Sequence, residues 1–474
     1  MSALTATEEP RKVCVIGAGP SGVAMCRALK ERGVPYDCFE RSPAVGGLWR
    51  YPGVGGTGCA YECLFSNSSK EVMQFPTFPM PDDFPNYPHH TQVADYLDAY
   101  VDHFGLREDI TFETEVESAR PSGDGWDVQV NGETRRYRAV CVASGGRHAE
   151  PSYAEIEGEF SGRSLHAFDY VNAKDFEGKT VVVLGLGASA ADIASEVSQL
   201  AERTYLAVRT GHWVVPKILL GHPIDQPSPL IGKLPIRARS QLLSIAMKIV
   251  HGKMSDHGLP DPPYRVGLGS PIVTTGLLPA ITHGRVLPKP AIVRLDGDAI
   301  HFADGSQVQA DALIYCTGYK IGFPMLDEDL ISGGSDAPPL YNLAVPPEIP
   351  GLYFIGLLHS LLAHIPCAEA QAEWIGDVLT GDVELPPANE MWRTIRRDRR
   401  RMDRLFHDSS GHLLVDQHEF LRRLKRERRT RATGGRRGRA GGAGQTPRAT
   451  TALVTAGSVE TTGASARTHG DPPK

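Results

Sequence analysis

The chain has 474 residues, too many for one hydrophobic core of ordinary domain size. Its charged fraction of 22% and its formal net charge of −6 are unremarkable, which removes the case for a nucleic-acid or membrane surface in the main body. The sequence has no run of about 18 apolar residues and its first ten residues are polar and acidic, so we expect a cytoplasmic protein without a membrane span or a secretory signal.

The first predicted unit is a strand, a glycine-rich turn, a helix and a second strand. Residues 12–16 and 35–39 are short apolar runs, and residues 20–32 between them have a helical pattern. The turn is Gly17-Ala18-Gly19-Pro20-Ser21-Gly22, whose glycines allow a tight turn, approach of a pyrophosphate and packing of the helix on the strand. Glu40 ends the second strand, near the spacing of about 20 residues at which a carboxylate accepts hydrogen bonds from ribose hydroxyls. The unit predicts a site for FAD or NAD; a plain tight turn is the alternative.

The next stretch has no nucleotide fingerprint. Residues 76–90 are rich in Pro and aromatics and are expected to be irregular, residues 91–104 to be a helix, and residues 111–142 to be short strands. Gly145 and Gly146 follow the last of these strands. We expect Gly145 to lie near the adenine half of a dinucleotide, with a plain turn as the alternative.

The strand, turn and helix pattern then returns. Residues 179–184 are predicted as a strand, 189–202 as a helix and 204–208 as a strand. The second turn is Gly185-Leu186-Gly187-Ala188-Ser189-Ala190, in which Ala190 replaces the third glycine. Arg209 stands where the first unit has its acid and suits a 2′-phosphate, with Thr210 and His212 able to assist. This unit predicts an NADPH site; an ordinary surface arginine is the alternative.

Two such units imply an α/β fold with two doubly wound dinucleotide-binding domains, a larger FAD domain and a smaller NADPH domain inserted in it. Residues 217–260 mix helical stretches with turns, 291–316 return to strands and 393–431 form a charged helical segment. The expected division is residues 1–150 for the first part of the FAD domain, 151–320 for the NADPH domain with its helical insert, 321–431 for the second part of the FAD domain with the C-terminal helical segment, and 432–474 for a disordered tail.

Further motifs are spread over residues 10–395. They are Phe39-Glu40-Arg41, Gly46-Gly47-Leu48-Trp49, Tyr61-Glu62-Cys63-Leu64-Phe65-Ser66-Asn67, Lys70-Glu71, Phe75-Pro76, Pro81-Asp82-Asp83-Phe84-Pro85, Phe160-x-Gly162-x-x-x-His166-x-x-x-Tyr170, Tyr315-Cys316-Thr317-Gly318-Tyr319 and Pro366-x-Ala368-Glu369-x-Gln371-Ala372-x-Trp374. Together they resemble the flavin-containing monooxygenase family of the class B flavoprotein monooxygenases. The resemblance implies that FAD stays bound and that NADPH visits and donates a hydride.

The fingerprints and the resemblance together assign the cofactor-binding residues. Those expected to bind FAD are Gly17, Gly19, Pro20, Ser21, Gly22, Glu40, Arg41, Gly47, Leu48, Trp49, Ser66, Val116, Gly145 and Gln371. Those expected to bind NADPH are Tyr170, Gly185, Gly187, Ser189, Ala190, Arg209 and Thr210. The histidines have no metal-ligand spacing, so no metal is expected.

The resemblance implies one catalytic side chain, Asn67. In the family mechanism O2 adds to reduced flavin as a C4a-(hydro)peroxyflavin, and a neutral amide hydrogen-bonds it without supplying a proton. The alternative for Asn67 is a turn-forming residue within Ser66-Asn67-Ser68-Ser69. His166 is expected to be a structural link between domains, with a catalytic acid as its alternative.

The implied reaction is NADPH-consuming insertion of one oxygen atom from O2 into an amine nitrogen or a thioether sulfur of a small-molecule substrate, an activity of the N,N-dimethylaniline monooxygenase kind. Tyr170 ends its motif where Baeyer–Villiger enzymes usually carry Trp, so ketone oxygenation is the second choice. A homodimer is common in the family, and no membrane partner is expected.

Two remote alternatives stay open. Cys59 and Cys63 are separated by three intervening residues, whereas NADPH-dependent disulfide reductases usually have two or four, and the scattered cysteines favour free thiols. The arginines at 422–439 could bind nucleic acid, although a solvated helix explains them and no nucleic-acid partner is expected.

Overall fold

The computed structural model describes residues 12–51, 60–146, 150–226, 234–331, 337–406 and 411–432. The chain divides into two units, Met1–Thr433 and Gly434–Lys474, and every element named below belongs to the first. Residues 433–474 of the predicted tail lie outside the described residues, as does Cys59. Ala432 forms an isolated bridge with Val383, so the folded body extends one residue further than predicted.

A five-stranded parallel sheet carries the first glycine turn, with strand order β23-β7-β1-β2-β3. Its strands are β1 (Val13–Ile16), β2 (Tyr36–Phe39), β3 (Ile110–Thr111), β7 (Ala139–Val142) and β23 (Leu352–Phe354). Strands β1 and β7 are buried along their whole length, as expected for strands covered on both faces. Because β23 comes from late in the chain, two distant segments build one sheet.

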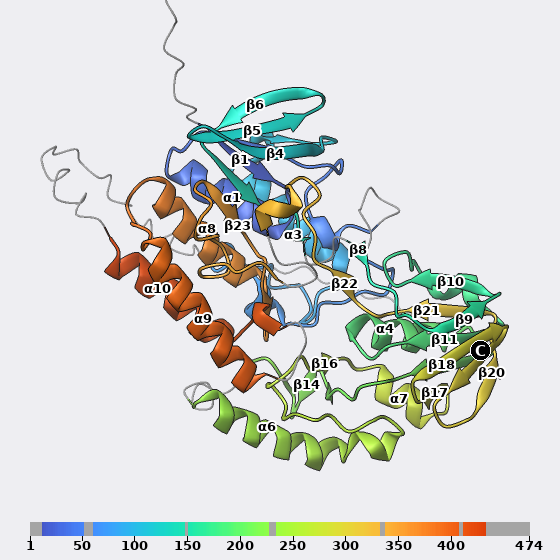
Figure 1. Ribbon diagram of the computed structural model, residues 1–474. Coiled ribbons are helices and arrows are strands. Elements are labelled where there is room, and N and C mark those ends of the chain that lie inside the picture. The colour runs from blue at the N-terminus through green and yellow to red at the C-terminus, as the bar shows by residue number, and fades with distance from the viewer. Residues whose placement is uncertain are drawn as a thin grey trace, which may run out of the picture. The chain divides into compact units, whose positions relative to one another are not determined.

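Helices α1 (Pro20–Glu31), α3 (His90–His103) and α8 (Ile365–Leu379) share a hydrophobic core with this sheet. Arg32, directly after α1, pairs with Glu373 and Asp377 of α8, each at 2.7 Å. An antiparallel sheet of β4 (Val116–Ser122), β5 (Gly125–Val130) and β6 (Glu133–Tyr137) lies beside β1 in Figure 1. The short elements here are η1 (Gly47–Trp49), α2 (Lys70–Met73) and η3 (Arg107–Asp109).

A second five-stranded parallel sheet carries the second glycine turn, with strand order β10-β21-β11-β12-β17. Its strands are β10 (Arg163–His166), β11 (Thr180–Leu184), β12 (Arg203–Ala207), β17 (Val286–Lys289) and β21 (Ala312–Tyr315). Helix α4 (Ala188–Val197) joins β11 to β12 and shares a core with α7 (Leu277–Thr282) and η5 (Ala173–Phe176). Two parallel sheets, each opened by a glycine turn, confirm the predicted α/β fold.

Smaller elements complete the second part of the fold. A four-stranded sheet contains β9 (Glu157–Phe160), β18 (Ile292–Gly297), β19 (Ala299–Phe302) and β20 (Gln307–Gln309). The segment between β12 and β17 contains β13 (Val214–Val215), β14 (Ile218–Leu219), β15 (His222–Pro223), α6 (Ile236–His251), η6 (Met254–His257), β16 (Ile272–Val273) and α7.

The chain passes between the two sheets at a pair of antiparallel segments, β8 (Glu150–Pro151) and β22 (Tyr319–Lys320). These lie at the boundaries proposed near residues 150 and 320, which stay predictions. The remaining elements are η7 (Glu328–Ile331), β24 (His359–Ser360), α9 (Ala388–Leu405), η8 (Gly411–Leu413), β25 (Leu414–Val415) and α10 (Gln417–Thr430).

Two predicted helices have different bounds in the structure. The charged segment 393–431 is two helices, α9 and α10, which lie side by side in Figure 1. The second begins where the Asp416 carboxylate accepts the Glu419 N–H at 3.0 Å, a capping interaction that composition did not reveal. The helix predicted over 189–202 ends at Val197, and β12 begins at Arg203. Within the described ranges, no helix is long and apolar enough to cross a membrane.

Candidate active site

In the first glycine turn, two of the glycines leave no room for a Cβ atom, whereas the third has open space at that position. Gly17 has φ +98°, and a Cβ there would lie 2.9 Å from the Ala143 carbonyl oxygen. A Cβ on Gly22 would lie 1.8 Å from the Gly17 carbonyl oxygen, so helix α1 can start here only with glycine. A Cβ on Gly19 would meet nothing closer than the Gly47 Cα, at 3.6 Å. The turn therefore leaves space above Gly19 at the N-terminus of α1, which fits a pyrophosphate.

Glu40 is buried at the end of β2 and faces this turn. One carboxylate oxygen accepts the Ala18 N–H at 2.6 Å, and the other accepts the N–H and the hydroxyl of Ser42 at 2.9 and 2.7 Å. A carboxylate has about four lone-pair positions, so about one remains for a ribose hydroxyl. Glu40 fixes the turn and fits the predicted ribose contact.

The other residues predicted for FAD lie on several elements. The Gly46 N–H donates to the Ala18 carbonyl at 3.2 Å, which places η1 against the turn and Gly47 against Gly19. Near it, Leu48 is exposed, Trp49 is partly buried and Arg41 is exposed. Val116 is buried on β4, and Gly145 has φ +71° with open space at its Cβ position. The FAD roles of these residues stay predictions.

Gln371 occupies a supporting position. Its side chain is wholly buried, accepts the Gly356 N–H at 2.9 Å and donates to the carbonyls of Asn342 and Leu343 at 3.1 and 3.2 Å. Gly356 packs so closely that a Cβ there would lie 2.1 Å from the Ser21 hydroxyl oxygen. Gln371 thus links α8 to the first glycine turn through Gly356. Its predicted contact with FAD stays a prediction, and the geometry favours an indirect role.

The second glycine turn repeats the arrangement of the first. Gly185 has φ +124°, and a Cβ there would lie 2.5 Å from the Cys316 carbonyl oxygen. A Cβ on Gly187 would meet nothing within 4 Å. Ala190 is fully buried on α4, so a small residue suffices where the first turn needs Gly22, and Ser189 is partly buried. The open position at Gly187 fits a second pyrophosphate.

Arg209 and Thr210 are exposed just beyond β12. Among the described residues Arg209 forms no ion pair with a carboxylate, so its guanidinium is available to a phosphate. The Nδ1 atom of His212 lies 2.6 Å from the Tyr264 hydroxyl. The exposed arginine and the open glycine turn on one sheet fit the predicted NADPH site.

Asn67 has a buried amide oxygen with no hydrogen-bond partner among the described residues. The surrounding turn is made by its neighbours, because the Ser66 hydroxyl donates to the Ser68 carbonyl at 2.8 Å and the Ser66 N–H donates to the Pro88 carbonyl at 2.9 Å. Leaving a buried acceptor without a partner costs about 1–3 kcal/mol. The free oxygen favours a ligand-facing role for Asn67 over the turn-forming alternative.

Residues 61–63 join the first part of the fold to helix α4. The Tyr61 hydroxyl donates to the Asp192 carboxylate at 2.8 Å, and the Cys63 thiol donates to the Glu196 carboxylate at 3.0 Å. Burial raises the pKa of Asp192 to about 6. This contact was not predicted from the sequence, where its one signal is two acids four residues apart on a helix of small apolar residues.

Tyr170 belongs to the same contact. It is wholly buried, its hydroxyl donates to Glu196 at 2.7 Å, and burial beside that carboxylate raises its pKa. Its ring stacks on Phe176 with a centroid distance of 6.0 Å. The predicted NADPH contact of Tyr170 stays a prediction, and the geometry favours an effect through α4.

His166 and Cys63 bear on the two alternative chemistries. His166 is buried, its Nδ1 accepts the Phe168 N–H at 3.1 Å, and burial lowers its pKa, which favours a neutral structural histidine. Burial raises the pKa of the Cys63 thiol, which disfavours the thiolate that a disulfide reductase needs.

Known proteins with similar sequences belong to one family. A model described as flavin-binding monooxygenase-like matches residues 10–426. Flavin-containing monooxygenase 3 of Rattus norvegicus is 35% identical over 407 residues, 80% of this chain and 76% of the relative. Dimethylaniline monooxygenase (N-oxide-forming) 2 of the same organism is 33% identical over 431 residues, covering 85% and 80%.

Solved structures share the fold. S-allyl-L-cysteine S-oxygenase from Allium sativum has a TM-score of 0.67 and 24% identity, with 90% of each chain covered. The open structure of cyclohexanone monooxygenase has a TM-score of 0.66 and 17% identity, with 88% of this chain and 97% of the neighbour covered.

Proposed function

Because the chain belongs to the flavin-binding monooxygenase-like family, which uses FAD and NADPH, it is a flavin monooxygenase, and we propose that it oxygenates soft nucleophiles, amine nitrogens or thioether sulfurs. The observation that supports its use of both cofactors is the pair of glycine turns, each with one open glycine, one followed by Glu40 and the other by Arg209. An acid suits the ribose of FAD, whereas an arginine suits the 2′-phosphate of NADPH.

Different residues of this chain are proposed to bind FAD and NADPH. We propose that Gly19 and the N-terminus of α1 hold the FAD pyrophosphate, that Glu40 accepts a ribose hydroxyl, and that Gly187 with Arg209 holds NADPH. When bound, FAD supplies hydride acceptance and oxygen activation. The rest of the predicted FAD and NADPH set is proposed with them, Gln371 acting through Gly356 and Tyr170 through α4.

Asn67 is proposed as the catalytic side chain. Its buried, unpartnered amide oxygen and its neutral charge let it hydrogen-bond a reacting group or NADP⁺ without supplying a full proton. We also propose, as the family resemblance implies, that one oxygen atom of O2 is transferred to the substrate at this site.

The substrate class rests on two observations. Tyr170 stands at the position where Baeyer–Villiger enzymes usually carry Trp. The relatives with the higher identity include one whose name specifies N-oxide formation, whereas cyclohexanone monooxygenase, at 17% identity, is similar in fold alone. Ketone oxygenation is therefore the second candidate.

A substrate panel tests the choice. NADPH consumption, product and hydrogen peroxide are measured with trimethylamine, a thioether and a cyclic ketone. The proposal predicts coupled N-oxide or sulfoxide formation and uncoupled NADPH consumption with the ketone. Coupled lactone formation without N- or S-oxygenation would contradict it.

A further inference from the structure

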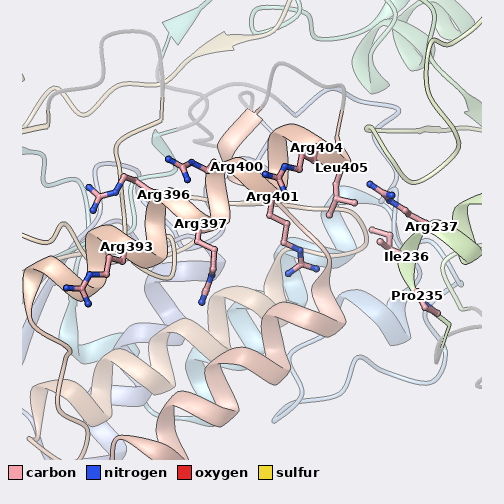
Figure 2. A pocket seen from close by; sticks show the side chains of 10 residues that line it. All are labelled: Pro235, Ile236, Arg237, Arg393, Arg396, Arg397, Arg400, Arg401, Arg404 and Leu405. Carbon is pink, nitrogen blue, oxygen red and sulfur yellow. The ribbon is translucent and has the colours of Figure 1, made fainter.

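A cavity of about 740 Å³ lies between helix α9 and the start of α6. It is lined by six arginines of α9, namely Arg393, Arg396, Arg397, Arg400, Arg401 and Arg404. Figure 2 shows them along the helix, with Arg237 of α6 near the Leu405 end. The cavity shares no lining residue with either glycine turn, so the proposed function does not account for it.

Some of the cavity arginines differ in their pairing from other arginines near the C-terminal helices. Arg423 pairs with Asp398 at 2.6 Å, and Arg428 and Arg431 also have carboxylate partners. Within the described part of the chain, Arg393, Arg396 and Arg400 have none and are exposed. The cavity lining therefore combines two paired arginines, Arg397 with Asp398 and Arg401 with Glu419, with arginines that have no carboxylate partner among the described residues.

The spacing of these charges opposes helix formation. Arg396 and Arg400 are four residues apart and therefore share one helix face, where like charges repel. A bound anion at this helix face would relieve the repulsion.

Arginine favours one anion chemistry. Its planar guanidinium binds phosphate oxygens in pairs and is weakly hydrated, so several together select a multiply charged phosphate. The volume lies within the range of about 300–1,000 Å³ that small-molecule sites occupy. We propose that the arginine cavity binds a multiply charged phosphate ligand.

Such a phosphate can be a free ion or a lipid headgroup. Helix α6 starts at the cavity and exposes Leu242, Ile245 and Ile249 on its outer face, with Ile249 79% exposed. An apolar stripe beside a cationic cavity is the combination that binds anionic lipid surfaces. Both sources share the phosphate chemistry, and the two arms of the test separate them.

The test uses the full-length, FAD-loaded protein. One arm titrates inorganic tripolyphosphate by calorimetry at low and moderate salt, with sulfate as the reference anion. The other arm sediments vesicles of phosphatidylglycerol or of phosphatidylcholine. Arg396→Gln/Arg400→Gln should weaken binding by about tenfold or more. Arg203→Gln/Arg285→Gln removes the same charge from exposed arginines outside the cavity and should leave binding unchanged.

Each outcome decides the proposal. Arginine-dependent binding of tripolyphosphate identifies a free-phosphate site, and arginine-dependent binding of phosphatidylglycerol vesicles alone identifies a headgroup site. No binding in either arm, equal losses in both double variants, or tripolyphosphate binding no tighter than sulfate would overturn it. NADPH oxidation should stay unchanged in both variants, which separates this result from any failure of the proposed function.

Discussion

We propose that the exposed side chain of Arg209 makes the second glycine turn select NADPH over NADH. Arg209→Ala should remove a charged hydrogen bond of about 1.5–3 kcal/mol to the 2′-phosphate, which raises the KM for NADPH by about one to two decades. The KM for NADH should barely change. Steady-state kinetics with both cofactors measures this, with Arg203→Ala at the start of the same strand as control. Equal loss for both cofactors would show that Arg209 is structural.

Asn67 is the residue at which oxygen transfer and peroxide loss should separate. Asn67→Leu removes the unpartnered amide oxygen, and Asn67→Asp places a negative charge where one develops. Both variants should still oxidise NADPH, because Arg209 and Gly187 are unchanged, but should release hydrogen peroxide in place of product. The ratio of product to NADPH consumed is measured after FAD occupancy is confirmed. Tight coupling in Asn67→Leu would make the residue a turn former.

The elements that hold these residues differ in how far the sequence predicts them. Gly17, Gly19 and Gly22 were predictable because their roles depend on local spacing between one strand and one helix. The contact of Tyr61 with Asp192 was not, because the two are joined only by packing of distant segments. The division into α9 and α10 was missed because the charged, helix-forming residues on both sides outweighed the weak helix formers Ser409, Ser410 and Gly411 between them.

The glycine turns predict opposite results for two alanine substitutions. Gly22→Ala places a Cβ 1.8 Å from a backbone oxygen and should destabilise the protein, whereas Gly19→Ala has room in the fold but fills the space proposed for the pyrophosphate. Gly19→Ala should therefore fold with unchanged circular dichroism and thermal unfolding of the FAD-free form, yet release its flavin. Wild-type flavin content in Gly19→Ala would contradict the assignment.

Asp192 on helix α4 should make stability pH-dependent. Its pKa is about 6 in the fold and roughly 3.9 in an unfolded chain, so the folded state holds the proton more tightly. Asp192 contributes most favourably to the free energy of unfolding when its carboxyl group is protonated. This contribution falls as the pH rises through the window, by about 1 kcal/mol between pH 5 and 7. Asp192→Asn keeps an acceptor for Tyr61 and should lose this dependence. Denaturant unfolding of both proteins at the two pH values measures it, and parallel pH profiles would refute the assignment.

At the scale of the whole molecule, two distant chain segments build the first sheet and the second sheet is inserted between them. The two glycine fingerprints made this architecture predictable, because each nucleotide-binding unit is recognisable from a short stretch of sequence. The C-terminal support of the first turn, through Gln371 and Gly356, was predictable only in part, because it depends on buried hydrogen bonds across the sheet. The arginine cavity was not predicted, since it needs the relative placement of α6 and α9.

The central claim is that the chain couples NADPH oxidation to transfer of one oxygen atom from O2. The most direct measurement supplies ¹⁸O₂ with a thioether and follows NADPH consumption and label in the sulfoxide. The account predicts one labelled oxygen in each sulfoxide, formed in step with NADPH consumed and with little hydrogen peroxide. Unlabelled product, or NADPH consumption that yields only hydrogen peroxide from the fully FAD-loaded protein with every amine and thioether tried, would contradict it.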